Sequence, residues 1–155
     1  MKIFCDRSDH LLFLNRLKEN IMPVETPVPV KKYGYVRKVL PAGSFDLISY
    51  CLMPTHFHLL IRQNTDLPIN VLISKICTGY AKCFNKKYKR VGGLFQDQFK
   101  SVLVESDEQL RWVIDYIHNN PIKDGLVNNL NNYEFSSYLD YVEKRKSAFL
   151  KKMPI

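Results

Sequence analysis

Two apolar stretches, separated by only two residues, restrict the fold of this chain more than any other feature of its sequence. They cover residues 45–53 and 56–61, with Pro54 and Thr55 between them. Strands in globular proteins contain about 5–6 residues, and a proline-containing dipeptide between two apolar runs is typical of a tight connection. We therefore expect an antiparallel pair of strands here, with the second strand central or nearly central in its sheet.

The second predicted strand opens with two histidines, His56 and His58. Because side chains alternate between the faces of a strand, both imidazoles are expected on one face and Phe57 on the other. Two imidazoles that converge from one strand can chelate a divalent cation. Paired histidines can also simply hydrogen-bond to their neighbours or lie half exposed, so the spacing alone leaves both interpretations open.

Two further segments have the periodicity of amphipathic helices. The first covers about residues 8–20, with Ser8 or Asp9 as its N-terminal cap. The second begins near Asp66 and has Pro68 in its first turn, where proline is tolerated.

A third helix is predicted between Ser106 and Pro121. Ser106 and Gln109 fit a capping box, and Pro121 is expected to end the helix. At about 100° per residue, Tyr116 and Asn120 lie about 40° apart on one border of its apolar face. They present a phenol and a carboxamide to the sheet, although a boundary tyrosine and a helix-capping asparagine would look the same. The apolar residues expected to face the core are Leu110, Val113, Ile114 and Ile117.

The charge balance favours a polyanionic partner. The 155 residues include 23 lysines and arginines against 15 aspartates and glutamates, a net charge of +8. Nucleic acid is the usual partner of such a basic domain, and a membrane surface is the competing one. No apolar run approaches the ~20 residues of a spanning helix, and no secretory leader opens the chain, so we expect a cytoplasmic protein without a membrane partner.

The end of the second predicted helix concentrates this positive charge, with Phe84 and Tyr88 interleaved among the basic residues. Such a run is typical of nucleic-acid contact, and equally of a solvated helix end, where cations are favourable. A loop and a strand at residues 99–104 are expected to follow. The residues predicted to contact nucleic acid are Lys82, Lys86, Lys87, Lys89, Arg90 and Lys100.

The imidazole pair and the polar border of the third helix together outline a centre that cleaves phosphodiesters. A divalent cation held by His56, His58 and an oxygen donor would keep open positions for a phosphate oxygen. The Tyr116 phenol, with an ordinary pKa near ~10, is a poor nucleophile unless a metal or nearby cations favour its ionised form.

The chain resembles the single-tyrosine HUH transposases, and in particular the branch called REP-associated tyrosine transposases. The resemblance rests on YCLMPTHFHLLI at 50–61, YAKCFNKKYKRVGGLFQDQFKS at 80–101 and LRWVIDYIHNNPIKDGLV at 110–127. Weaker similarity extends to residues 3–17 and 133–138. These segments occur in order and cover most of the chain.

The resemblance implies a single transposase domain over residues 1–155 with a ferredoxin-like α+β fold, an antiparallel sheet with helices packed on one face. It implies that His56 and His58 hold Mg²⁺ or Mn²⁺, with Asn120 as the third ligand. It also implies that Tyr116 attacks single-stranded, hairpin-bearing DNA, forms a 5′-phosphotyrosine link and releases a 3′-hydroxyl. A strand with a free 3′-hydroxyl can then attack this link, so no ATP is needed.

Two departures from the family pattern bear on this expectation. The family has a strand before the stretch that here begins almost at Met1, so that strand is expected to be absent. Either the proline-rich, extended insertion at 22–46 replaces it, or the sheet keeps an unpaired edge that favours a homodimer. In addition, Gln98 stands where relatives often carry arginine, which removes one phosphate contact.

Two alternative functions stay open. The chain could be a catalytically inactive, truncated relative that only binds DNA hairpins. It could also be a metal-dependent hydrolase in which water, rather than Tyr116, attacks the phosphate.

Overall fold

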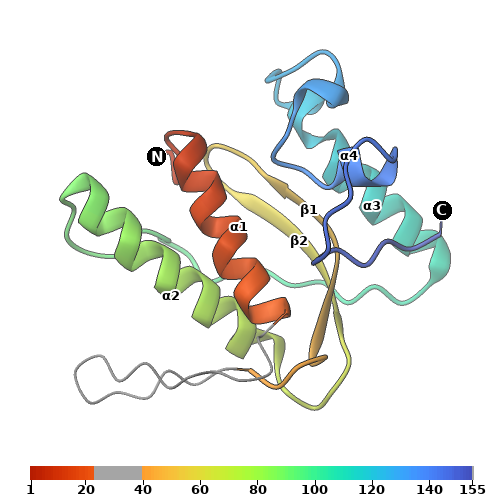
Figure 1. Ribbon diagram of the computed structural model, residues 1–155, viewed down its shortest axis with the longest axis horizontal. Helices are drawn as coiled ribbons and strands as arrows, with labels where there is room; N and C mark the ends of the chain where they lie inside the picture. The colour runs from red at the N-terminus through yellow and green to blue at the C-terminus, as the bar shows by residue number, and fades with distance from the viewer. Residues whose placement is uncertain (23–39, 155) are drawn as a thin grey trace.

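The structure is a computed structural model that describes residues 1–22 and 40–154 (Figure 1). Most of the predicted insertion at 22–46 lies outside the described residues. In chain order the described elements are α1 (Arg7–Ile21), β1 (Phe45–Leu52), β2 (Phe57–Gln63), α2 (Ile69–Tyr88), α3 (Asp107–Lys123), the 3-10 helix η1 (Leu130–Asn132) and α4 (Tyr138–Tyr141).

Strands β1 and β2 form the predicted antiparallel pair. Leu52 lies opposite Phe57 at the connected end. The connection closes with a backbone hydrogen bond of 2.8 Å from Met53 N–H to the His56 carbonyl. The register shifts once, between Leu47 and Ser49 of β1, which marks a bulge. The hairpin prediction is therefore confirmed.

The two outer edges of this pair differ. The far edge of β1 is covered by the C-terminal segment, through backbone hydrogen bonds such as Ser137 N–H to the Tyr50 carbonyl, 2.9 Å, and Lys151 N–H to the Leu47 carbonyl, 2.8 Å. Among the described residues, β2 pairs only with β1. The expectation of a central second strand is therefore wrong for the described part of the sheet, where β2 is an edge strand.

Residues 99–104, predicted as a strand, form no regular structure. A groove of about 1930 Å³ is lined by β2, by part of α2 and by residues 94–107, so this segment faces β2 without pairing with it. Its apolar residues Val102 and Leu103 remain 82% and 77% exposed. A strand needs a hydrogen-bonded neighbour, and none of the described residues supplies one.

Helices α1 and α2 pack together on one face of the sheet (Figure 1). Phe13 and Leu17 of α1 and Tyr80 of α2 are fully buried in a core shared with β1 residues such as Leu47. Burial of each such side chain stabilises the fold by about 1.5–3 kcal/mol. The predicted α+β class with an antiparallel sheet is confirmed, but the prediction that the helices pack on one face is wrong, because a third long helix packs on the other face. None of the described helices is long and apolar enough to cross a bilayer.

Helix α3 covers the opposite face of the sheet. Its residues Ile114 and Ile117 are buried in a second core with Ile48 of β1 and Leu60 of β2. The predicted apolar face of this helix is therefore the one that faces the core. The two partly buried members of this face are Leu110 and Val113.

The first two helices begin close to their predicted starts. The cap of α1 is Asp6 rather than Ser8 or Asp9: its side chain accepts a 2.9 Å hydrogen bond from Asp9 N–H, and Asp9 accepts from Asp6 N–H in return. This reciprocal pair is a capping box. Helix α2 begins at Ile69, three residues after the predicted start near Asp66, so Pro68 is its N-cap rather than part of its first turn.

Helix α3 begins as predicted but does not end at Pro121. Ser106 caps it by accepting a 3.1 Å hydrogen bond from Gln109 N–H. The helix then continues through Pro121 to Lys123. Proline has no N–H, so the carbonyl four residues earlier loses its normal partner. The side-chain amide of Asn120 donates to that carbonyl, on Ile117, at 3.4 Å.

Candidate functional site

At the start of β2, the phenylalanine and histidine side chains point to opposite faces of the sheet. The Phe57 ring lies 4.8 Å from the Phe13 ring, on the α1 and α2 side. His58 lies beside Tyr116 of α3 on the other side. His56 immediately precedes β2 and stays close to His58. The predicted alternation of these side chains is confirmed.

The two imidazoles lie close enough to share a ligand. Their ring centroids are 5.0 Å apart, with the planes at 88° to each other. The Nδ1 atom of His56 is 3.0 Å from the hydroxyl oxygen of Thr55. Burial lowers the pKa of His58, assisted by the neighbouring His56 and by Lys123 and opposed by the carboxylate of Asp124. His58 is therefore held in its neutral form, the form that binds metal ions.

Tyr116 meets this histidine pair from α3. Its ring centroid lies 5.8 Å from that of His58, at an interplanar angle of 82°. On another side, Trp112 stacks on the phenol at 5.2 Å, and Lys123 Nζ lies 5.4 Å from the ring centroid. Tyr116 is 37% exposed, so its phenol is accessible from solvent. The strand and the helix thus bring Tyr116 and His58 together, as predicted.

The site is poor in hydrogen bonds within the protein. Among the described residues, neither the His58 ring nor the Tyr116 hydroxyl makes a hydrogen bond. Both groups are held by ring contacts and packing instead. Polar atoms that the fold leaves without partners retain their full capacity to bind a ligand.

Asn120 is placed differently from Tyr116. It is buried, and its Nδ2 donates to the carbonyls of Tyr116 at 2.8 Å and Ile117 at 3.4 Å. These contacts are to α3 itself and none reaches a histidine. The amide therefore has a structural role in the helix. Its Oδ1 accepts no hydrogen bond from the described residues, and its role as a metal ligand stays a prediction.

The predicted basic residues divide into two groups. Lys87 and Arg90 are held by the protein: Lys87 Nζ forms ion pairs with Asp6 at 2.6 Å and Asp9 at 2.8 Å, and Arg90 donates to the Asn85 side chain at 2.8 Å. The other four are exposed: Lys82, Lys86, Lys89 and Lys100.

The basic end of α2 is remote from Tyr116. It lies beside the start of α1, on the other side of the sheet from α3 (Figure 1). The two regions that the sequence singled out are therefore on different sides of the molecule. A DNA molecule contacting both would have to pass around the sheet.

Three residues near the site escaped the sequence prediction: Trp112, Lys123 and Asp124. Trp112 lies four residues before Tyr116, which is helical-neighbour spacing and was a readable signal. Lys123 lies seven residues after Tyr116, but the assumed stop at Pro121 excluded it from the helix. Asp124, just after the helix, acts on His58 through its charge.

Within the described ranges, no group of three or more His, Cys, Asp or Glu side chains converges to hold a metal ion. Any metal bound by the two histidines would therefore need an amide, phenol, phosphate or water oxygen to complete its coordination. Mg²⁺ and Mn²⁺ accept such oxygen ligands.

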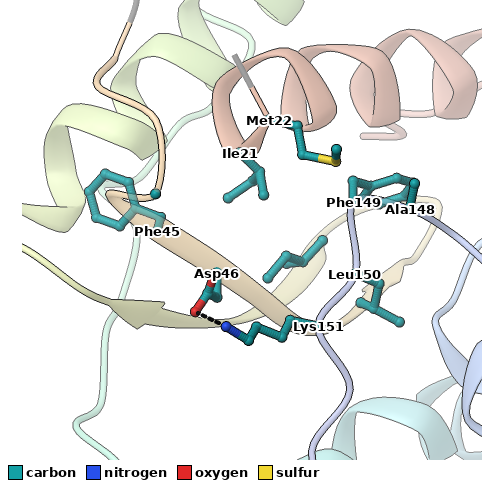
Figure 2. Close-up of a pocket in the computed structure, with 10 residues that line it drawn as sticks. Ile21, Met22, Phe45, Asp46, Ala148, Phe149, Leu150 and Lys151 are labelled. Carbon is teal, nitrogen blue, oxygen red and sulfur yellow. Dashed lines mark ion pairs between the residues drawn. The ribbon is translucent and has the colours of Figure 1, made fainter. Parts of the chain in front are cut away.

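A second cavity, of about 260 Å³, lies at the opposite end of β1 (Figure 2). Ile21 of α1 and Met22, the C-cap of that helix, line it on one side, and Phe149 and Leu150 line it from the C-terminal segment. Its charged groups, Asp46 and Lys151, pair with each other at 3.5 Å. It contains none of the predicted site residues.

Comparison with known proteins defines the class. The family model described as transposase IS200 like matches residues 7–120, which is well over half of the chain. This chain belongs to the IS200-like transposase family.

Two similar proteins have more specific descriptions. The chain is 30% identical over 106 residues to a Haemophilus influenzae protein described as a REP-associated tyrosine transposase; the match covers 61% of this chain and 59% of that protein. It also resembles a solved structure of a REP-associated tyrosine transposase bound to a REP hairpin, with a TM-score of 0.62 and 14% identity over 96% of this chain and 83% of that one. The predicted family resemblance is confirmed, and the structural match confirms the fold.

Proposed function

We propose that this protein cleaves and rejoins single-stranded, hairpin-bearing DNA, with Tyr116 as the nucleophile. The observation that carries the proposal is the accessible Tyr116 phenol packed against His58 with no hydrogen bond to the described residues. The Tyr116 Oη forms a bond to phosphorus, the bond from phosphorus to the 3′ oxygen breaks, and the proton lost by the phenol is matched by one gained at that oxygen. Attack by a 3′-hydroxyl on the phosphotyrosine reverses the step.

We further propose that His56 and His58 hold a divalent cation, Mg²⁺ or Mn²⁺, with the Oδ1 of Asn120 as the third donor. The fit rests on three features: two adjacent imidazoles, the neutral form favoured at His58, and an amide oxygen without a partner among the described residues. When bound, such a cation supplies charge stabilisation at the phosphate.

The chain's own residues supply the rest of the mechanism. The ammonium group of Lys123 lies over the Tyr116 ring, 5.4 Å from its centroid, and makes a cation–π contact with it. Stacking of Trp112 restricts the rotation of that ring. Because His58 is neutral, it does not repel a bound cation as a charged imidazolium would.

DNA is the proposed substrate for two reasons. The net charge is +8, and one structurally similar transposase is described as bound to a REP hairpin. We propose that this chain also recognises a DNA hairpin, and that the exposed lysines Lys82, Lys86, Lys89 and Lys100 contribute phosphate contacts with Lys87 and Arg90 beside them. Action on DNA would make it a cytoplasmic, nucleoid-associated protein.

The edge of β2 supports a further proposal, homodimer formation. This edge pairs with no strand other than β1 in the described parts of the chain. An unpaired edge is a template for a strand from another chain. Analytical ultracentrifugation over a range of concentrations would detect the dimer.

The experiment that tests the function is capture of the covalent intermediate. Hairpin-bearing single-stranded DNA, labelled at its 3′ end, is incubated with Mn²⁺ and resolved under denaturing conditions. Because the proposed link is to the 5′ phosphate, the label should migrate with the protein. The adduct should disappear in Tyr116→Phe and after chelation of the metal. Tyr138→Phe, which removes the same hydroxyl from α4, is the matched control and should keep it.

The other outcomes separate the alternative functions. Binding without any adduct, under Mg²⁺ and Mn²⁺ alike, would identify a protein that only binds DNA. Cleavage that continues in Tyr116→Phe would identify water as the nucleophile.

A further inference from the structure

Trp112 is a large aromatic side chain that the fold does not bury. It lies on α3 one turn before Tyr116 and is 63% exposed. Exposed apolar residues are common singly, but a tryptophan is among the costliest side chains to leave in water. Its position beside the candidate nucleophile suggests that the bound substrate covers it.

The indole has one occupied face and one accessible face. Its ring is nearly parallel to that of Tyr116, with an interplanar angle of 16° and centroids 5.2 Å apart. Tyr116 is the one aromatic neighbour of Trp112 in the described part of the chain. Since 63% of the residue remains exposed, the face away from Tyr116 is open to a planar group.

We propose that Trp112 is a stacking platform for a DNA base adjacent to the phosphate that Tyr116 attacks. The inference rests on the proposed function, because that function places DNA at Tyr116. A base and an indole stack through their π-faces, which gives affinity without a requirement for one base identity. The stack would run from the base through Trp112 to Tyr116, which places the base one ring away from the reacting group.

The surroundings favour stacking over charge as the origin of this contact. Glu108 and Asp115 lie at helical-neighbour positions to Trp112 and are exposed, whereas Arg111 is the adjacent basic residue. These mixed charges give no net attraction for a phosphate. The contribution of Trp112 should therefore be nearly independent of salt, unlike that of a lysine.

A direct measurement is available because Trp112 is the single tryptophan of the chain. Its fluorescence is followed while the full-length protein, in EDTA to prevent cleavage, is titrated with a DNA hairpin flanked by single-stranded thymidine tails. Anisotropy of a dye on the same DNA reports binding separately. We expect strong quenching on binding. Moving one abasic site along the tails should restore the fluorescence at a single position and weaken binding about tenfold there.

Variants separate this role from a merely structural one. Trp112→Leu should lower DNA affinity about tenfold, abolish the dependence on the abasic position and leave the salt dependence unchanged, whereas Trp112→Phe should retain part of the affinity. Both variants should melt close to the parent protein, because the residue is exposed. If Trp112 only supports the Tyr116 ring, affinity would not respond to the abasic position in any variant.

The outcomes also distinguish this inference from the proposed function. Binding without quenching, or quenching that ignores the abasic position, overturns the platform and leaves cleavage by Tyr116 untouched. Position-dependent quenching without any covalent adduct in Mn²⁺ supports the platform and overturns the catalytic proposal. Absence of DNA binding overturns both.

Discussion

The α1–α2 charge cluster, formed by Asp6, Asp9, Lys87 and Tyr88, and the site between β2 and α3 are both rich in polar groups but use them differently. In the cluster the groups satisfy one another: Lys87 pairs with both carboxylates, and the Tyr88 hydroxyl donates to Asp9 at 2.7 Å. In the site, His58 and the hydroxyl of Tyr116 make no hydrogen bond with the described residues. The cluster is built to hold the helices together, whereas the site keeps its polar atoms for a ligand.

The largest test of this contrast is His58→Asn. We expect adduct formation to fall by on the order of 10²–10³-fold, because the substitution removes a proposed ligand and the ring against which Tyr116 packs. The melting temperature should change little, since the imidazole makes no hydrogen bond with the described residues. Adduct yield at saturating DNA and thermal melting by circular dichroism measure the two effects. A large fall in melting temperature with adduct formation retained would show that His58 stabilises the fold rather than binding a ligand.

Lowering the pH should remove the stabilisation at α3 and at the α1–α2 charge cluster in different pH ranges. Burial of His118 lowers its pKa to about 4 from an ordinary value of 6.5. The unfolded chain therefore binds more protons between these values, and stability should fall by up to about 3 kcal/mol as the pH drops from 6.5 to 4. Urea unfolding at several pH values measures this loss.

The stabilisation that the ionised Asp9 carboxylate gives to the fold should disappear at a lower pH than the effect of His118. Burial raises the pKa of Asp9, but hydrogen bonds from Lys87 and Tyr88 and from the Cys5 N–H outweigh it, and the net shift is below the ordinary 3.8. A group with a lowered folded pKa stabilises above its ordinary value and loses that effect as the pH falls further. In His118→Gln the loss between pH 6.5 and 4 should be smaller, with a remainder from His10 and His58, whose pKa values burial also lowers, while the loss below 3.8 persists. Equal pH profiles for this variant and the parent would show that His118 is not the responsible group.

The smallest expected effects come from two neighbouring lysines, of which Lys87 is ion-paired and Lys86 is exposed. Lys87→Met leaves the Asp9 carboxylate, whose side chain is 1% exposed, without its cation and should lower the stability of the protein. Lys86→Met should change stability by less than about 0.5 kcal/mol and reduce the slope of log affinity against log salt by about 1. Urea unfolding and DNA binding at several salt concentrations compare them. Equal stability and equal salt dependence of DNA binding in the two variants would contradict the distinction between paired and exposed lysines.

Local sequence patterns predicted the hairpin and the three long helices. The features that were predicted wrongly depend on contacts between residues far apart in the sequence. Helical spacing and the Pro54-Thr55 break depend on neighbouring residues, so they are readable along the chain. The predicted strand at 99–104 required a partner strand elsewhere, and the described part of the chain offers none. The basic character of Lys87 was readable, but its acidic partners lie at the start of α1, about eighty residues earlier.

The candidate site was predicted in outline for the same reason. Strand alternation gave the common face of His56 and His58, and helical spacing gave the border position of Tyr116. Which groups surround them depends on how α3 packs on the sheet. Lys123 was missed because the consequence of Pro121 was judged from the backbone alone, without the side chain that compensates for it.

The amide of Asn120 does in α3 the work of the N–H that Pro121 lacks. A side chain has thereby become part of the main-chain ladder, and the two positions are tied together. Replacing Asn120 with a residue that cannot donate would remove this contact, so the two positions act together at this turn of the helix.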